Sequence, residues 1–228
     1  MKLKLKKYKK IINLIKKFNF NNFELITNYG LFSGDTNLFK TLKIYEILIQ
    51  TKLIKGDIIE FGIHRGNTSL LIKKILKIFK IKKKLYLFDH FKGLIHYQKK
   101  DTEISKTLRG KYVGKKKEIQ SFVKFFNFNN IKIIDKDATT LTPNFFNKNQ
   151  KFSLAYFDMD LYLPTIKALN AIDKNISKGG YIVFDEGAKK FWSERIAIKE
   201  FLKENHKYSK IIIDKNRQPD VILKKISD

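Results

Sequence analysis

The sequence predicts an α/β fold: a seven-stranded, mostly parallel sheet with helices on both faces and a C-terminal antiparallel hairpin strand. Three observations support this prediction. Short apolar runs rich in β-branched and aromatic residues alternate along the chain with amphipathic helical patterns. Most of these runs are followed by an acidic residue. The last two runs, 210–213 and 220–223, lie close enough in sequence to pair as antiparallel strands.

The composition fits one globular core. A chain of 228 residues with 43% hydrophobic and 14% aromatic residues is long enough for one sizeable core. It contains no cysteine, which excludes a disulfide framework and a cysteine-based zinc site. The N-terminus lacks the apolar core of a signal peptide, and no stretch approaches the roughly 20 apolar residues of a membrane span. We therefore expect a cytoplasmic protein with no membrane span.

The formal net charge of +26 has two explanations. Basic proteins attract phosphates, anionic lipids and nucleic acids. However, the abundant residue types lysine, isoleucine, asparagine and phenylalanine all have AT-rich codons. A biased genome would therefore produce much of this charge without a polyanionic partner, so the charge by itself assigns none.

Residues 1–55 are expected to form a helical or lid segment before a domain of residues 56–228, within a single-domain protein overall. Residues 1–18 show an amphipathic pattern, with eight lysines among the first seventeen residues. Such a helix binds a membrane surface or a partner, or packs on the domain with its charged face solvated; we favour the packed helix. Residues 19–35 are polar and turn-rich, and 38–53 form a second amphipathic helix.

The stretch 56–67, GDIIEFGIHRGN, is the centre of the predicted site. Its apolar run predicts a strand buried on both faces, and the carboxylate of Glu60 inside that run needs a partner. Gly62 and Gly66 then permit a tight turn before a helix over 69–79. A strand, a glycine turn and a helix N-terminus hold cofactors in α/β proteins. The G-x-x-x-G spacing differs from the dinucleotide fingerprint, which argues against nicotinamide or flavin; an ordinary strand–helix turn is the alternative.

The rest of the chain continues the alternation of strands and helices. Residues 89–114 show little periodicity and predict a long loop, which in a compact domain is usually functional. The other predicted elements are the strands 85–88, 131–134, 152–157 and 181–184 and the helices 118–126, 164–175 and 191–204.

Four of the five predicted parallel strands end in an acid or run on to one within a few residues. The acids are Asp89, Asp137, Asp158 and Asp185. Ligands of such sheets bind outside the carboxyl ends of the strands, so we expect these side chains to converge on a ligand. A carboxylate after the second strand, here Asp89, can accept hydrogen bonds from both hydroxyls of a ribose. Each acid alone would also suit a turn or a helix cap.

Several motifs occur together, in order, over about residues 35–205. They are Glu60-Phe61-Gly62 with Arg65-Gly66, then Phe88-Asp89-His90-Phe91-Lys92-Gly93-Leu94, then Asp158-Met159-Asp160-Leu161-Tyr162 with Thr165, then Gly179-Gly180 and Asp185-Glu186. This set resembles the macrocin O-methyltransferase family, which are Rossmann-like class I S-adenosylmethionine-dependent methyltransferases that methylate sugar hydroxyls. Glu186 departs from the family pattern, which usually has a second aspartate there, and the N-terminal part that gathers acceptor contacts is short.

The resemblance implies a role for each motif. The cofactor S-adenosylmethionine would have Glu60, Gly62, Arg65 and Gly66 around its amino-acid part, Asp89 at its ribose and Asp137 with Ala138 beside its adenine. The full set of implied cofactor-binding residues is Glu60, Gly62, Arg65, Gly66, Asn67, Asp89, His90, Phe91, Asp137, Ala138 and Asp158. A divalent ion, Mg²⁺, would be bound by Asp158, Asp185 and Glu186, because three hard oxygen ligands suit it. Asp158 would also act as the catalytic base.

These implications lead to the expectation of a Mg²⁺-dependent O-methyltransferase acting on a sugar hydroxyl of a nucleotide sugar, surface glycan or glycosylated metabolite. Two alternatives remain open. A nucleic-acid methyltransferase is favoured by the charge, but no recognisable RNA-binding module is present, so we expect no nucleic-acid partner. A non-catalytic basic module that binds a glycan or membrane surface would not need the acids retained at the strand ends. A homo-oligomer is compatible with the sequence.

Overall fold

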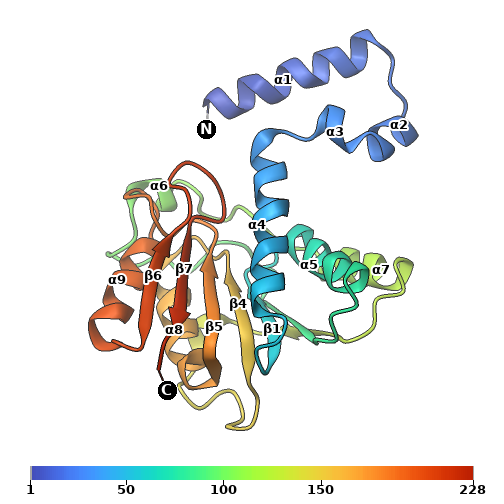
Figure 1. Ribbon diagram of the computed structural model, residues 1–228. Coiled ribbons are helices and arrows are strands. Elements are labelled where there is room, and N and C mark those ends of the chain that lie inside the picture. The colour runs from blue at the N-terminus through green and yellow to red at the C-terminus, as the bar shows by residue number, and fades with distance from the viewer. Residues whose placement is uncertain (1, 228) are drawn as a thin grey trace. The chain divides into compact units, whose positions relative to one another are not determined.

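A computed structural model describes residues 2–227 of the chain (Figure 1). The chain forms two compact units, the first ending at Phe39 and the second beginning at Lys40. In the first unit, α1 (Lys2–Lys17) confirms the helix expected at the N-terminus. None of the helices described is both long enough and apolar enough to cross a bilayer.

The polar segment after α1 contains two short helices that its composition did not predict. They are α2 (Asn22–Thr27) and α3 (Tyr29–Phe32). A capping box explains α2, because the Asn21 side chain accepts a hydrogen bond from the Glu24 amide at 3.0 Å, and the Glu24 carboxylate accepts one from the Asn21 amide at 2.8 Å.

The second unit is built on a seven-stranded sheet in the order β3-β2-β1-β4-β5-β7-β6. Neighbouring strands among β1 to β5 pair in parallel, whereas β7 pairs antiparallel with both β5 and β6. This arrangement confirms the predicted α/β class and its C-terminal antiparallel strand. The strands are β1 (Asp57–Phe61), β2 (Leu85–Asp89), β3 (Ile131–Asp135), β4 (Phe152–Phe157), β5 (Ile176–Phe184), β6 (Tyr208–Ile212) and β7 (Val221–Lys225).

Helices cover both faces of this sheet (Figure 1). Helices α8 and α9 pack on one face, and α5, α7 and the part of α4 within the second unit pack on the other. The apolar stripes of these helices bury against the sheet to form one core on each side. The helices are α4 (Asp35–Thr51), α5 (Asn67–Ile78), α6 (Glu103–Lys106), α7 (Lys116–Phe125), α8 (Tyr162–Ile172) and α9 (Glu194–Glu204), with short 3₁₀ turns at Ala138–Thr140 and Asp173–Asn175.

Most element boundaries differ from the sequence-based prediction by one to three residues, and β5 differs the most. Strand β5 begins at Ile176 instead of residue 181, because the glycines form an irregularity inside the strand: Gly179 has a φ of +80° and the β4–β5 register shifts there. Helix α9 begins at Glu194, three residues later than predicted. The loop 89–114 contains one helical turn, α6, which Thr102 caps.

The carboxyl ends of the four central strands are in register. Phe61 of β1 is paired with Phe88 of β2 and Phe157 of β4, and Phe157 is paired with Phe184 of β5. Adjacent rings have centroids 5.2, 4.8 and 5.1 Å apart, and all four rings are buried in the core on the α8–α9 side. The next residue of each strand therefore falls at one sheet edge. These residues, in sheet order, are Asp89, Gly62, Asp158 and Asp185.

Replacement of Gly62 by alanine tests how closely two of these strand ends approach. Gly62 has a φ of +80°, and a Cβ atom there would lie 2.0 Å from the carbonyl oxygen of Asp158. The left-handed conformation alone costs a non-glycine residue roughly 1–2 kcal/mol, and the clash adds to that cost. We expect Gly62→Ala to lower the thermal unfolding midpoint at least twice as far as Gly110→Ala, a glycine with a φ of +70° and no atom within 4 Å of its Cβ position. Equal midpoints for the two variants would contradict the close approach.

Candidate active site

The turn from β1 to α5 forms the first wall of the site. Gly62 and Gly66 both have left-handed backbone conformations, with φ of +80° and +81°. Gly66 is the N-cap of α5 and provides no side-chain cap. The first-turn amides of a helix without a side-chain cap are suited to bind an anionic group such as a carboxylate. Asn67, one of the predicted cofactor residues, is the first residue of this helix.

Glu60 lies buried beneath this turn, with only 1% of its surface exposed. The Ser69 hydroxyl, from the first turn of α5, donates a hydrogen bond to its carboxylate. Burial raises the pKa of Glu60 to about 8, although the Ser69 hydrogen bond and the positive charge of Lys40 oppose that rise. Glu60 therefore fixes the start of α5 relative to β1, and its carboxyl group holds or releases a proton near neutral pH.

Asp89 connects the end of β2 to the glycine turn. Its Oδ2 atom accepts hydrogen bonds from the Ile63 and His64 amides at 2.7 and 3.0 Å, and its Oδ1 atom accepts one from the Phe91 amide at 2.7 Å. A carboxylate oxygen accepts about two hydrogen bonds, so Oδ1 retains capacity for a ligand hydroxyl. Asp89 thus orders the glycine turn through three backbone amides.

Arg65 points toward a neighbouring helix in this structure. Its guanidinium group pairs with the Glu118 carboxylate of α7, with nitrogen–oxygen distances of 2.9 and 3.0 Å, and its side chain is 61% exposed. This exposed pair gives Arg65 a contact that the sequence pattern did not predict.

His90, Asp137 and a third residue, His96, form a compact polar cluster near the ends of β2 and β3. One potential ligand atom from each lies within 4.8 Å of the others, which makes this the one three-residue metal-binding arrangement among the described residues. Asp137 accepts hydrogen bonds from the Thr139 amide and hydroxyl, both at 2.8 Å, and contacts the His96 ring. The Lys92 amide donates to His90 Nδ1 at 3.0 Å, which leaves the proton of a neutral ring on Nε2 and disfavours metal ligation there. Ala138 is buried in the adjoining core.

Asp158 and Asp185 lie side by side at the ends of β4 and β5, as their strand register requires. A buried tyrosine, Tyr156, donates its hydroxyl hydrogen to Asp185 Oδ1. The ammonium group of Lys40, from α4, lies 2.7 Å from Asp185 Oδ1 and 3.8 Å from Asp158 Oδ2. Burial, together with the neighbouring charge of Asp185, raises the pKa of Asp158 well above its usual value, while Lys40 opposes this rise.

Further acids line the same edge. Burial, together with the charge of Asp185, raises the pKa of Asp160 to about 7, and a hydrogen bond shared with Glu186 opposes this rise. Burial and the charge of Asp160 raise the pKa of Glu186 to about 9, and Gln218 donates a hydrogen bond to its carboxylate. Glu194, the first residue of α9, accepts a hydrogen bond from the Met159 amide at 2.8 Å, and its second carboxylate oxygen is buried without a hydrogen-bond partner.

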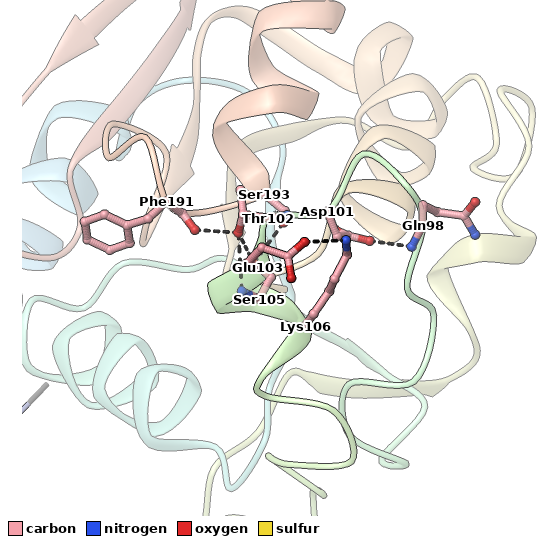
Figure 2. A network of polar contacts seen from close by, with 8 residues as sticks. All are labelled: Gln98, Asp101, Thr102, Glu103, Ser105, Lys106, Phe191 and Ser193. Carbon is pink, nitrogen blue, oxygen red and sulfur yellow. Dashed lines mark hydrogen bonds and ion pairs between the residues drawn. The ribbon is translucent and has the colours of Figure 1, made fainter.

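The long loop 89–114 is anchored to the segment that precedes α9 by the network in Figure 2. The Thr102 amide donates to Ser193 Oγ at 3.0 Å, and the Thr102 hydroxyl donates to the Phe191 carbonyl at 2.5 Å. Ser193 in turn donates to Ser105 Oγ at 2.8 Å, and Ser105 donates to the Asp160 carbonyl at 3.2 Å. The start of α9 therefore fixes both the loop and the backbone of Asp160.

Tyr112 extends from the same loop toward the acids. Burial raises the pKa of its hydroxyl, and the charges of Asp160, Glu186 and Asp158 raise it further. The residue is 46% exposed, and its ring packs edge-on against the His64 ring, with centroids 5.5 Å apart.

Three residues of the site lie outside the sequence-based prediction, and two of them carry a sequence signal. Asp160 lies within the DMDLY motif. Glu194 is an acid at the start of a predicted helix, and its sequence neighbours do not indicate its burial. Lys40 interrupts the apolar stripe of α4, at helical spacing before the buried Ile44, Ile47 and Leu48. A charged residue on a buried stripe is a signal for a partner.

Comparison with known proteins decides the family. The family model for macrocin-O-methyltransferase (TylF) matches residues 34–216. The chain belongs to this family. It is therefore an O-methyltransferase, and the resemblance noted in its motifs is confirmed.

Solved structures agree with this fold. The calicheamicin methyltransferase CalS11 superposes with a TM-score of 0.78 at 20% identity, covering 98% of this chain and 93% of CalS11. The O-methyltransferase NovP superposes with a TM-score of 0.68 at 17% identity, covering 87% and 82%. An rRNA methylase from Streptococcus thermophilus gives 0.50 at 14% identity, covering 86% and 98%. At such identities the likeness establishes the fold. No curated protein matched the chain.

Asp89→Ala tests the ribose position. A hydrogen bond to a charged group contributes about 1.5–3 kcal/mol, so we expect at least a roughly tenfold weaker affinity for S-adenosylmethionine, measured by calorimetry. Because three backbone amides also lose their acceptor, the unfolding midpoint should fall as well. Asp135→Ala, at the end of β3, is the control, because Asp135 pairs with exposed Lys116. Unchanged cofactor affinity in a folded Asp89→Ala variant would remove Asp89 from the cofactor site.

Proposed function

We propose that this O-methyltransferase transfers the methyl group of S-adenosylmethionine to a sugar hydroxyl, and that Asp158, Asp185 and Glu186 hold a Mg²⁺ ion that orients this hydroxyl. The observation that carries the proposal is the side-by-side placement of Asp158 and Asp185, whose carboxylates both approach one cationic group, at the sheet edge next to the glycine turn. Membership of the macrocin-O-methyltransferase family supports the sugar acceptor.

Asp158 and Asp185 suit a hard divalent cation, whereas Glu186 would complete the ligand set only after a rearrangement, because the ligand atoms of these three acids do not all lie within 4.8 Å of one another in the part of the chain that the structure describes. Two carboxylates follow neighbouring strands, which lie about 4.8 Å apart in a sheet, so their oxygens are able to bind one ion at about 2.1 Å each. A lysine ammonium already lies within 4 Å of both carboxylates, which supports a cation position between them. Glu186 is the third proposed ligand, and its contacts with Gln218 and Asp160 would have to change when it binds the ion.

The proposed cofactor residues support a bound S-adenosylmethionine in the same way. The α5 N-terminus provides first-turn amides for its carboxylate, Asp89 Oδ1 keeps hydrogen-bonding capacity for the ribose, and Asp137 with Ala138 lies beyond β2 for the adenine. Glu60 lies under the turn, where its charge state would change the electrostatic attraction between the site and the amino group of the cofactor. His90, Phe91 and Asn67 complete this proposed wall, and Arg65 would act from its surface pair with Glu118.

The reaction moves one methyl group and one proton. The acceptor oxygen attacks the methyl carbon as the carbon–sulfur bond breaks, and the hydroxyl proton passes to a carboxylate of the site. When bound, Mg²⁺ lowers the pKa of a hydroxyl that it coordinates and fixes its position. Asp158 is the proposed base, and Asp160 is a second carboxylate whose raised pKa, about 7, suits proton transfer near neutral pH. Precise positioning supplies much of the rate of such a displacement.

Removal of divalent ions tests the metal role. We expect EDTA to abolish methyl transfer and added Mg²⁺ to restore it, with transfer measured from labelled S-adenosylmethionine to nucleotide sugars and surface-glycan fragments. Asp158→Asn should reduce kcat by at least about a hundredfold, as loss of a general base does, while the affinity for S-adenosylmethionine stays within a few-fold. Full activity in EDTA would refute the metal role, and Asp158 would then act as a base alone.

Tyr112→Ala tests the acceptor side. An aromatic ring offers apolar surface to the apolar face of a sugar ring, and each Å² of apolar area that such a contact removes from water contributes about 25 cal/mol. We expect the KM for the acceptor to rise about tenfold, while the affinity for S-adenosylmethionine is unchanged. Tyr112→Phe should behave like the parent, because the proposed contact is with the ring. An equal loss in both variants would assign the effect to the hydroxyl.

A nucleic-acid substrate is the second candidate, favoured by the net charge of +26. Salt-sensitive RNA binding together with methyl transfer to RNA would support it. RNA binding without methyl transfer would reflect only the charge of the surface.

A further inference from the structure

A lysine from a helix outside the family motifs is placed against the acids of the proposed metal site. The Lys40 ammonium lies 2.7 Å from Asp185 Oδ1 and 3.8 Å from Asp158 Oδ2. The Lys40 and Asp185 side chains are only 16% and 5% exposed, so water screens this pair weakly. A single positive charge thus reaches both carboxylates from neighbouring strand ends.

Lys40 is held in this position by its place on α4. It lies four residues before the buried Ile44, and Ile47 and Leu48 continue the same helical stripe into the core. Its ammonium also lies 5.5 Å from the centre of the Tyr156 ring, and the hydroxyl of that tyrosine donates to Asp185 Oδ1. The helix, the ring and the carboxylates together direct Lys40 into the site.

The same contacts limit how the Oδ1 atom of Asp185 binds a further ligand. A carboxylate oxygen accepts about two hydrogen bonds, and Asp185 Oδ1 already accepts one from Tyr156 and one from Lys40. A divalent ion bound to that oxygen would have to displace one of these donors. It would also lie beside the ammonium, and two cations so close repel each other in a weakly screened site.

We propose that Lys40 is the resident counter-ion of Asp158 and Asp185 and competes with the divalent ion for their carboxylates. This inference rests on the proposed metal role and adds a residue that the family motifs do not include. Without a bound ion, Lys40 neutralises part of a crowded group of acids and keeps the site folded. Binding of the ion requires the Lys40 ammonium to move away from the carboxylates. Lys40 therefore weakens the apparent affinity of the site for the divalent ion.

Binding of Mn²⁺, followed by electron paramagnetic resonance of the free ion, tests the competition directly. The variant Lys40→Met keeps the length of the side chain and removes its charge. We expect it to bind Mn²⁺ at least about tenfold more tightly than the parent, because the charge-assisted contact of Lys40 no longer competes with the ion. Lys40→Arg should restore weak binding. The matched control is Lys43→Met, on the same helix, because the Lys43 ammonium lies 2.6 Å from the Glu46 carboxylate. The Mn²⁺ affinity of this variant should equal the parent's.

Thermal unfolding gives a second readout that does not depend on activity. When no metal is added, the unfolding temperature of the parent should be nearly the same with and without EDTA. Lys40→Met should unfold several degrees lower in EDTA and regain stability with Mg²⁺, because the ion then replaces the missing positive charge. Lys43→Met should show no such metal-dependent recovery.

The parent protein allows a test without any substitution. Reaction of lysines with an amine-acylating reagent, mapped by mass spectrometry, should label Lys40 slowly in EDTA and at least several-fold faster with saturating Mg²⁺. Equal labelling with and without Mg²⁺, or equal Mn²⁺ affinity of the parent and Lys40→Met, would overturn the competition while leaving the metal role intact. Failure of both proteins to bind Mn²⁺, with full activity in EDTA, would refute the metal role itself and this inference with it.

Discussion

The register of the central strands is the constraint on which the site depends. Phe88, Phe61, Phe157 and Phe184 align across β2, β1, β4 and β5 and pack their rings into one core. A shift of one residue in any of these strands would turn its side chains to the opposite face. The aromatic row therefore fixes the height at which each strand ends, and hence where Asp89, Gly62, Asp158 and Asp185 lie. The core therefore determines the geometry of the sheet edge that carries these residues.

The edge of the sheet at which Asp89, Gly62, Asp158 and Asp185 lie carries many acids that are largely buried from solvent. Side chains alternate along a strand, so Asp158 and Asp185 point to the same face as Tyr156, toward α4 and α5. Burial raises the pKa of Asp160, Glu186 and Glu60 to about 7, 9 and 8. Such a group of acids is stable only with protons, hydrogen-bond donors or cations among them. Tyr156 and Lys40 provide part of this compensation, and the proposed ion would provide more.

Backbone donors and loop anchors complete the arrangement. Asp89 holds the glycine turn through three amides, and Glu194 and Ser193 hold the segment at Met159 and Asp160 through the start of α9. These residues are far apart in sequence, yet each ties a strand end to a loop or a helix start. The segment at Met159 and Asp160 is therefore ordered by contacts that a local sequence pattern does not contain.

The sequence by itself determined the elements and the edge. Local patterns carry this information: apolar runs marked the strands, the glycine turn marked the start of α5, and the acid after each strand predicted the edge where Asp89, Asp158 and Asp185 lie. The roles of these acids in binding cofactor and metal stay predictions. Only the tertiary structure decided that Gly179 and Gly180 lie inside β5, that Arg65 pairs with Glu118, and that Lys40 reaches Asp185. The physical reason is that burial and ion pairing depend on which elements pack together, and residues 145 positions apart meet only when α4 covers the sheet.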